Sequence, residues 1–337
     1  MKNTLIIAAL LSFAATLIVG FILLPILKKV MFDQKVREDV PESHKKKNGT
    51  PILGGLFFLI GTGFVSLFFM KEYPVTFSVL FVTWCFGLIG FSDDFVKAVL
   101  KKPLGMKAWQ KFGLQIIITL AFVLYLYLED YYTFAPYIPF AVGKTAQFGW
   151  ITVPVAVFIV LGTVNGSNFT DGLDGLETTV TAGICCFFII AALLLGSDVC
   201  VVEAIFLGGL LGFLMFNVNK AKVFMGDTGS LSLGGILGVS AVLIRKELLL
   251  PILCGIFFVE ALSVIVQRTY FKKTKAKYGE GRRVFKMAPL HHHFQKENPD
   301  ALLQHPSSIH PENKITVRFC IVSIILAVLT IVTLKIR

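Results

Sequence analysis

Long apolar runs separated by short polar stretches dominate the hydrophobic pattern of this chain. The runs have lengths suited to crossing about 30 Å of hydrocarbon as α-helix, and none shows the alternating pattern of a barrel strand. The pattern therefore predicts an all-α, polytopic integral membrane protein in which residues 1–337 form one membrane-embedded domain. The ten predicted transmembrane helices span about residues 5–27, 51–70, 75–92, 112–128, 151–166, 176–195, 199–216, 231–244, 248–267 and 315–334.

The composition supports a membrane protein. Hydrophobic residues make up 55% of the chain and charged residues only 16%, below the roughly 25% of soluble domains. The first apolar run exceeds the 7–15 residues of a typical signal-peptide core, and its positive charge follows it, so we expect a retained helix. All six cysteines fall in apolar runs without a C-x-x-C pair, which indicates small hydrophobes and no disulfide framework or metal site.

The net charge of +11 follows the membrane pattern and does not indicate nucleic-acid binding. Of the 32 lysines and arginines, 24 fall in the loops after the odd-numbered predicted helices. Because cytoplasmic loops are enriched in basic residues, we expect these five loops in the cytoplasm and both termini outside.

A polar, glycine-rich segment interrupts the apolar sequence between the fifth and sixth predicted helices. It contains Asn165, Asn168, Thr170, Asp171 and Asp174. Such groups are costly near lipid unless they face water, a metal or a polar ligand. Asp-Gly pairs also form ordinary turns, but the neighbouring amide and hydroxyl side chains favour a site, in which the two aspartates could share one helix face.

Two further acidic segments lie at the ends of predicted helices on the same side. Asp93 and Asp94 end the third helix, and because adjacent helical residues point about 100° apart, we expect one to serve chemistry and the other to support it. Asp227 lies between glycines, with Thr228 and Ser230 available as caps for the eighth helix. A carboxylate there suits a Mg²⁺–phosphate unit.

Two basic segments are candidates for substrate contacts. Lys45 to Lys47 precede Thr50 and Pro51 at a predicted helix entrance, where they could either anchor the chain to lipid headgroups or face a polyanionic substrate. The ninth loop, 268–314, is basic and contains His291 to His293. Three consecutive histidines lack the spacing of a zinc site, so donors to phosphate oxygens fit them better.

Four motifs in this order carry a family resemblance. They are Asp93-Asp94, Asn168 to Leu176, Phe224 to Ser230, and Ala288 to Phe294. Together they resemble the polyprenyl-phosphate N-acetylhexosamine-1-phosphate transferases. The His-His-His-Phe form and the segment from Gly49 to Gly55 are similar to the muramoyl-pentapeptide branch of that superfamily.

The resemblance implies an activity, a cofactor and partners. It implies transfer of phospho-MurNAc-pentapeptide from UDP-MurNAc-pentapeptide to undecaprenyl phosphate, giving lipid I and UMP in peptidoglycan synthesis. It also implies Mg²⁺, a ten-helix fold, a homodimer, and a bacterial cell membrane in which the active site faces the cytoplasm. The catalytic residues it implies are Asp93, Asp94, Asp227 and His291, with Asp227 as the metal ligand. The substrate-binding residues it implies are Lys45, Thr50, Lys111, Asn168, Asp171, Gly172, Leu173, Asp174, Asn217, Phe224, Gln267, His292 and His293.

Two other functions are compatible with parts of the pattern. A related transferase that uses UDP-GlcNAc would share most of these motifs. A cation-coupled transporter would also place acids in broken helices, but at the bilayer midplane and usually with internal repeats, which the sequence lacks.

The charge distribution generates a first prediction, on topology. Single cysteines at Lys46 and Lys275, in a cysteine-free background, should react with membrane-impermeant thiol reagents only after cells are opened, because both loops are predicted to be cytoplasmic. Labelling of both positions in intact spheroplasts would reverse the orientation and place the acidic motifs on the outer side.

Overall fold

The fold is built from helices, as the computed structural model shows for residues 2–31, 50–100, 102, 104–129, 136–140 and 149–335. Within these ranges no residue lies in a β-strand, and an isolated β-bridge joins Arg283 and Ala301. The helices are α1 (Lys2–Met31), α3 (Gly55–Phe69), α4 (Val75–Ala98), α5 (Ala108–Leu128), α6 (Thr152–Thr170), α7 (Leu176–Leu195), α8 (Val199–Asn217), α9 (Gly226–Leu243), α10 (Leu250–Leu253), α11 (Gly255–Tyr278), α12 (Leu290–His293) and α13 (Glu312–Lys335), with short 3-10 turns at Gly149–Ile151 and Glu247–Leu249.

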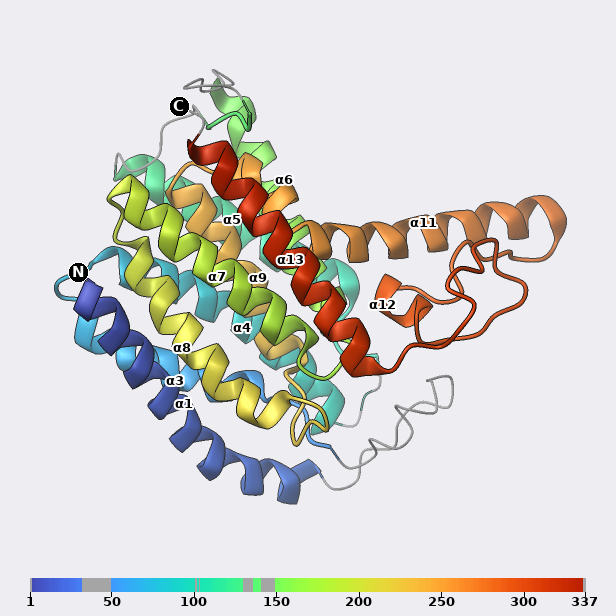
Figure 1. The fold of residues 1–337 in the computed structure, drawn as a ribbon, viewed down its shortest axis with the longest axis horizontal. Coiled ribbons are helices and arrows are strands. Elements are labelled where there is room, and N and C mark those ends of the chain that lie inside the picture. The colour runs from blue at the N-terminus through green and yellow to red at the C-terminus, as the bar shows by residue number, and fades with distance from the viewer. Residues whose placement is uncertain are drawn as a thin grey trace.

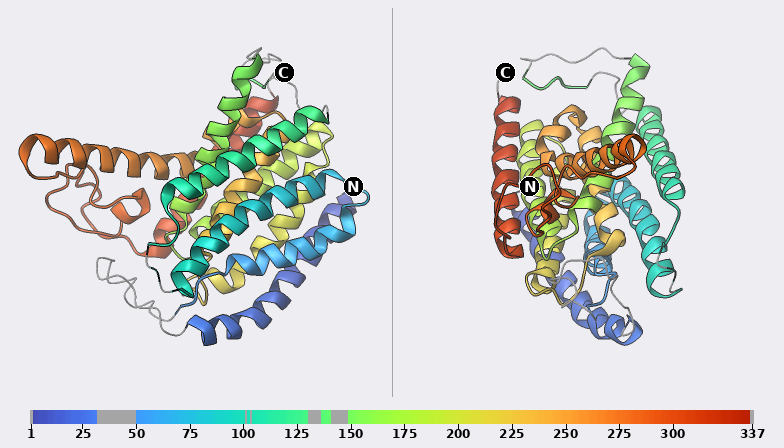
Figure 2. Two further views of the ribbon diagram at one scale, coloured as in Figure 1. Left: turned by 180° about the vertical axis from the view of Figure 1, so that it is seen from behind. Right: turned by 90° about the vertical axis from the view of Figure 1, so that its right-hand side faces the viewer.

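Every predicted apolar run contains helix, which confirms the all-α, multi-pass class. Seven of the described helices are long and apolar enough to cross a membrane, and an eighth arises if α10 and α11 form one broken span. The helix α3 is apolar but shorter, with 15 residues. The count of ten crossings therefore stays a prediction. The start of α1 and the end of α13 lie at the same end of the bundle (Figures 1 and 2), as an even number of crossings requires.

Several helix ends differ from the expected ones. The ninth run continues as α11 to Tyr278, beyond the residue 267 expected, and it is bent by 76° after Leu253. The helix α6 continues to Thr170 and α9 already begins at Gly226, so Asn168 and Asp227 are helical where loops were expected. The loops predicted after α6 and before α9 were too long, because polar residues at these two helix ends form hydrogen bonds with each other.

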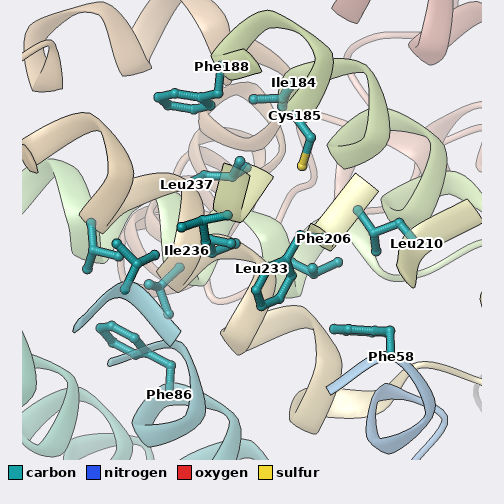
Figure 3. Packing of buried hydrophobic residues seen from close by; sticks show 14 of the residues in the cluster. Phe58, Phe86, Ile184, Cys185, Phe188, Phe206, Leu210, Leu233, Ile236 and Leu237 are labelled. Atoms are coloured by element: carbon teal, nitrogen blue, oxygen red, sulfur yellow. The ribbon is translucent and has the colours of Figure 1, made fainter. Parts of the chain in front are cut away.

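The helix α9 lies at the centre of the bundle. It packs mainly against α4 and α6, while α8 packs against α1 and α7 (Figure 1). Almost all side chains of α9 are buried, and Leu233, Ile236 and Leu237 meet Phe86 and Phe206 in the apolar core (Figure 3). In contrast, α11 projects away from the bundle, with α12 and its connecting segment alongside it (Figures 1 and 2).

Glycines allow the backbones of neighbouring helices to touch where the acidic residues lie. A Cβ on Gly90 of α4 would stand 2.0 Å from the carbonyl oxygen of Asp227. A Cβ on Gly55 of α3 would stand 2.3 Å from the amide nitrogen of Gly229. Since small residues permit close helix packing in membranes, α4 and α9 approach closely enough for Asp94 to reach the start of α9.

This close approach generates a second prediction. Gly90→Ala should destabilise the protein by about 1–3 kcal/mol, the scale of overpacking, because the added methyl group forces α4 away from α9. Thermal unfolding in detergent would measure the loss. The matched control is Gly113→Ala in α5, where a Cβ meets nothing within 4 Å. Equal unfolding temperatures for the two variants would contradict the contact.

Candidate active site

Three carboxylates converge at one end of the bundle. Asp93 and Asp94 lie near the end of α4, and Asp227 lies in the first turn of α9. One oxygen from each lies within 4.8 Å of the others. Asp93 and Asp94 are buried, and the Asp227 side chain is 17% exposed, so the cluster is open to a ligand on the Asp227 side.

Two lysine side chains balance this negative charge. Lys111 in the first turn of α5 places its Nζ 2.8 Å from Asp93 Oδ2 and 2.5 Å from Asp227 Oδ2. Lys97, one turn after Asp93, pairs with Asp93 and lies 3.4 Å from Asp227 Oδ2. The remaining Asp93 oxygen accepts a hydrogen bond of 2.6 Å from the Met106 amide. Both lysines therefore hold the carboxylates of Asp93 and Asp227 side by side.

Asp94 performs a different task from Asp93, as expected from their angular separation on the helix. Its carboxylate accepts hydrogen bonds from the Asp227 amide at 3.2 Å, the Thr228 amide at 2.8 Å and the Thr228 hydroxyl at 2.7 Å. Asp94 thus caps α9 from another helix, and a negative charge at a helix N-terminus is favourable. The prediction that Thr228 and Ser230 cap this helix was wrong, because both lie inside α9 and Asp94 supplies the cap.

The donor set at this cluster fits a hard cation. All three acids offer carboxylate oxygens, which divalent cations such as Mg²⁺ and Ca²⁺ prefer. The two ammonium groups already lie against Asp93 and Asp227, so these carboxylates bind positive charge together. The cluster is therefore able to hold a divalent metal.

The end of α6 holds the second carboxylate oxygen of Asp227, Oδ1. Asn168 donates hydrogen bonds of 2.9 Å from its Nδ2 to Asp227 Oδ1 and to Ser230 Oγ. Ser230 in turn donates to the Gly226 carbonyl at 3.0 Å. These bonds hold Asp227 between α5 and α6, so the predicted site residues Asp93, Asp94, Lys111, Asn168 and Asp227 form one cluster.

The turn between α6 and α7 carries the next predicted residues. Burial raises the pKa of the Asp171 carboxyl, and the negative charge of the Asp227 carboxylate acts in the same direction, which favours the neutral form of Asp171. Leu173 is buried in the apolar core. Asp171 and Asp174 do not share a helix face, because α7 begins only at Leu176.

Two predicted substrate-binding residues, Asp174 and Asn217, form hydrogen bonds with neighbouring segments of the chain. Asp174 Oδ2 accepts a hydrogen bond of 3.0 Å from the Ala221 amide. The Asn217 amide oxygen accepts from the Gly175 amide at 3.1 Å and from the Thr178 hydroxyl at 2.9 Å, and its Nδ2 donates to the Val223 carbonyl. They tie the α6–α7 turn to the segment between α8 and α9.

The histidine segment reaches the same turn. His291 is buried, and a Cβ on Gly172 would stand 2.1 Å from His291 Nε2. The His291 amide donates a hydrogen bond of 3.1 Å to Glu260 Oε1 of α11, and its Nδ1 lies 3.3 Å from the same oxygen. Glu260 therefore orients His291 against Gly172, the residue after Asp171.

The other two histidines contact their own loop. His292 Nδ1 lies 2.9 Å from Gln295 Oε1. His293 Nδ1 accepts from the Lys286 amide at 3.0 Å, so its Nε2 donates to the His305 carbonyl at 2.7 Å. Burial lowers the pKa of His293, in agreement with this neutral tautomer.

The remaining predicted residues belong to other segments or lie outside the described ranges. Gln267 of α11 accepts hydrogen bonds of 3.0 Å from the amides of Val284 and Phe285. Thr50 was expected at a helix entrance, but α3 begins only at Gly55. The adjoining Pro51 carbonyl instead accepts from the Phe224 amide at 2.8 Å, which brings the Thr50 and Phe224 segments together. Lys45 lies outside the residues that the structure describes.

The sequence analysis did not identify several groups that position the predicted site residues. Lys97 could have been found, because it stands four residues after Asp93 on one helix face. Glu260 could have been found as an acid inside an apolar run, which is rare and usually functional. The amide of Met106 carries no side-chain signal, because any residue could supply that N–H group.

Comparisons with known proteins identify the family of this chain. The model of "Glycosyl transferase family 4" matches residues 76–245. A phospho-N-acetylmuramoyl-pentapeptide-transferase of Acetivibrio thermocellus is 44% identical over 290 residues, 85% of either chain. Proteins of the same name from Caldicellulosiruptor bescii and Clostridioides difficile are 39% and 38% identical over 98% and 96% of either chain. The chain therefore belongs to glycosyl transferase family 4 and, within it, to the phospho-N-acetylmuramoyl-pentapeptide-transferase family.

Proposed function

We propose that this protein transfers phospho-MurNAc-pentapeptide from UDP-MurNAc-pentapeptide to undecaprenyl phosphate, giving lipid I and UMP. The observation that carries the proposal is the cluster of Asp93, Asp94 and Asp227 with two lysines at one end of a bundle of apolar helices. Relatives that bear the transferase name align with almost the whole chain, which supports the same donor and acceptor.

The reaction exchanges one pyrophosphate linkage for another. An oxygen of the lipid phosphate attacks the sugar-linked phosphorus of the donor, the bond from that phosphorus to the UMP oxygen breaks, and UMP leaves. Catalysis then consists mainly of positioning and of neutralising charge. Lys97 and Lys111 are placed to bind anionic oxygens, since each already reaches Asp227.

A magnesium ion fits the carboxylate oxygens of this cluster, with Asp227 as its main ligand. When bound, it neutralises charge on the diphosphate and polarises the reacting phosphorus. Asp94 holds the start of α9 and so fixes the position of Asp227. Asp93, held by the Met106 amide and the two lysines, orients the acceptor.

A general base has little to contribute to this reaction. The second pKa of a phosphate monoester lies near 6, so at pH 7 roughly 90% of the lipid phosphate is already the dianion. We therefore assign direct attack on the donor and no covalent intermediate on Asp93. The Asp93 carboxylate is buried, one of its oxygens accepts from the Met106 amide, and the other pairs with Lys97 and Lys111. These contacts agree with an orienting role.

The donor occupies the surface around the α6–α7 turn. We assign the uridine side to Asn168, the turn from Asp171 to Asp174, Asn217 and Phe224. Its other contacts are Thr50, Gln267 and the three histidines, with His291 closest to the turn, and Lys45 from the first loop. The cluster faces the cytoplasm of a bacterial cell, and the enzyme acts as a homodimer.

The second candidate is a transferase that uses UDP-GlcNAc. Purified protein, undecaprenyl phosphate and Mg²⁺ should release UMP from UDP-MurNAc-pentapeptide and not from UDP-GlcNAc. The reverse preference would establish the rival activity. A stoichiometric burst of UMP in the absence of lipid acceptor, with a sugar phosphate trapped on Asp93, would replace direct attack by a covalent route.

Asp227→Asn should lower the transfer rate at least about 10²-fold, the scale of losing one strong electrostatic stabiliser. It should also weaken Mn²⁺ binding measured by electron paramagnetic resonance, because an amide is a poorer ligand for a hard cation. The matched control is Asp198→Asn, an exposed aspartate before α8 at the opposite end of that helix from Asn217. Unchanged activity and metal binding in Asp227→Asn would move the metal to Asp93 or Asp94.

A further inference from the structure

A buried glutamate lies behind the acidic cluster and has no role in the mechanism above. Glu177 lies in the first turn of α7 and is 1% exposed. Its Oε1 lies 2.5 Å from the hydroxyl oxygen of Ser167, in the last turn of α6, and 2.9 Å from the hydroxyl oxygen of Thr181. Ser167 directly precedes Asn168, whose side chain holds Asp227.

The hydrogen count at Ser167 bears on the protonation state of this glutamate. The Ser167 hydroxyl oxygen lies 2.6 Å from the Ser230 carbonyl oxygen as well as 2.5 Å from Glu177 Oε1. A serine hydroxyl carries one hydrogen, and a carbonyl oxygen and a carboxylate can only accept. If Glu177 were ionised, one of these two short oxygen pairs would have no hydrogen between its members.

A proton on Glu177 resolves the conflict. The Glu177 O–H then donates to Ser167, and the Ser167 O–H donates to the Ser230 carbonyl. The second oxygen, Oε2, is buried and has no hydrogen-bond partner among the described residues. Such a position is tolerable for the carbonyl oxygen of a neutral acid and costly for a charged carboxylate.

We propose that Glu177 is a neutral, protonated acid that acts as a positioning residue for Asp227 through a Glu177–Ser167–Ser230 hydrogen-bond relay. Ser167 and Asn168 together bind the backbone carbonyl and the side chain of Ser230. The relay thus docks the end of α6 on the first turn of α9, which carries Asp227. A neutral partner does this without adding a fourth negative charge behind the three carboxylates.

The residues of the relay are not among those proposed to contact the metal or the substrates. Residues that orient metal ligands from behind typically change metal affinity or activity about 10- to 100-fold when they are removed. Because its activity readout rests on the proposed transfer reaction, the test also needs measurements that do not use transfer. Infrared spectroscopy and Mn²⁺ binding on the full-length protein supply them.

The infrared measurement tests the proton. The difference spectrum between the parent protein and Glu177→Gln at pH 7 should contain the carbonyl stretch of a protonated carboxyl group, shifted by ¹³C labelling of glutamate. A carboxylate band in its place would overturn the neutral acid, whatever the enzyme transfers.

The variants test the positioning. Glu177→Gln should keep Mn²⁺ affinity and turnover within about twofold, because its amide N–H can donate to Ser167 and its carbonyl can occupy the Oε2 position. Glu177→Met removes the donor at similar volume and should weaken Mn²⁺ binding and lower kcat by about tenfold or more. Ser167→Ala should act in the same direction, and adding Glu177→Met to it should produce no further loss if both act through one relay.

The matched control is Glu203→Gln, which changes another fully buried glutamate at the end of α8 opposite Asn217. It should leave Mn²⁺ binding unchanged. If Glu177→Met does not fold, Ser167→Ala alone carries the comparison. Parent-like Mn²⁺ affinity and kcat in whichever of the two variants folds would overturn the positioning role.

Discussion

The contact between Asp94 and the first turn of α9 is the interaction on which the site depends. A helix N-terminus buried in a membrane protein needs partners for its free amides, because lipid offers none. The Asp94 carboxylate is that partner, because it accepts hydrogen bonds from the amides of Asp227 and Thr228. This capping bond also brings the acids of α4 and α9 together, so the contact that completes α9 builds the acidic cluster as well.

The contact is possible only because side chains are missing where the two helices meet. Gly90 lies against the backbone of Asp227, and Gly226 adopts a left-handed φ of 75° beside Asp94. A Cβ at either position would meet an oxygen at 2.6 Å or less. The glycines near the acidic motifs thus permit the backbone approach that the cap requires.

Ion pairs and hydrogen bonds from several helices hold the residues of the site. At the ligand side, the two lysines offset the charge of Asp93 and Asp227. Behind them, hydrogen bonds from Asn168 and Ser167 hold the same turn of α9. At the α6–α7 turn, Glu260 of the projecting helix α11 orients His291 against Gly172. Glu260 of α11 thus positions the histidine segment at the α6–α7 turn.

The class of the protein and the acids of its site could be predicted from the sequence, because apolar runs of membrane length and acids at their ends are visible in the local composition. It predicted Asp93, Asp94, Asn168, Asp227 and Lys111, which the structure brings into one cluster. The roles of Asp94, Lys97 and Glu260 became visible only in the folded protein, because a helix cap, a shared ion pair and an oriented histidine depend on segments far apart in the chain. The end of α6 and the start of α9 were misjudged for the same reason: polar residues extend a helix when another element pairs with them, as Asn168 pairs with Asp227 and Asp94 with Thr228, and that pairing leaves no local pattern.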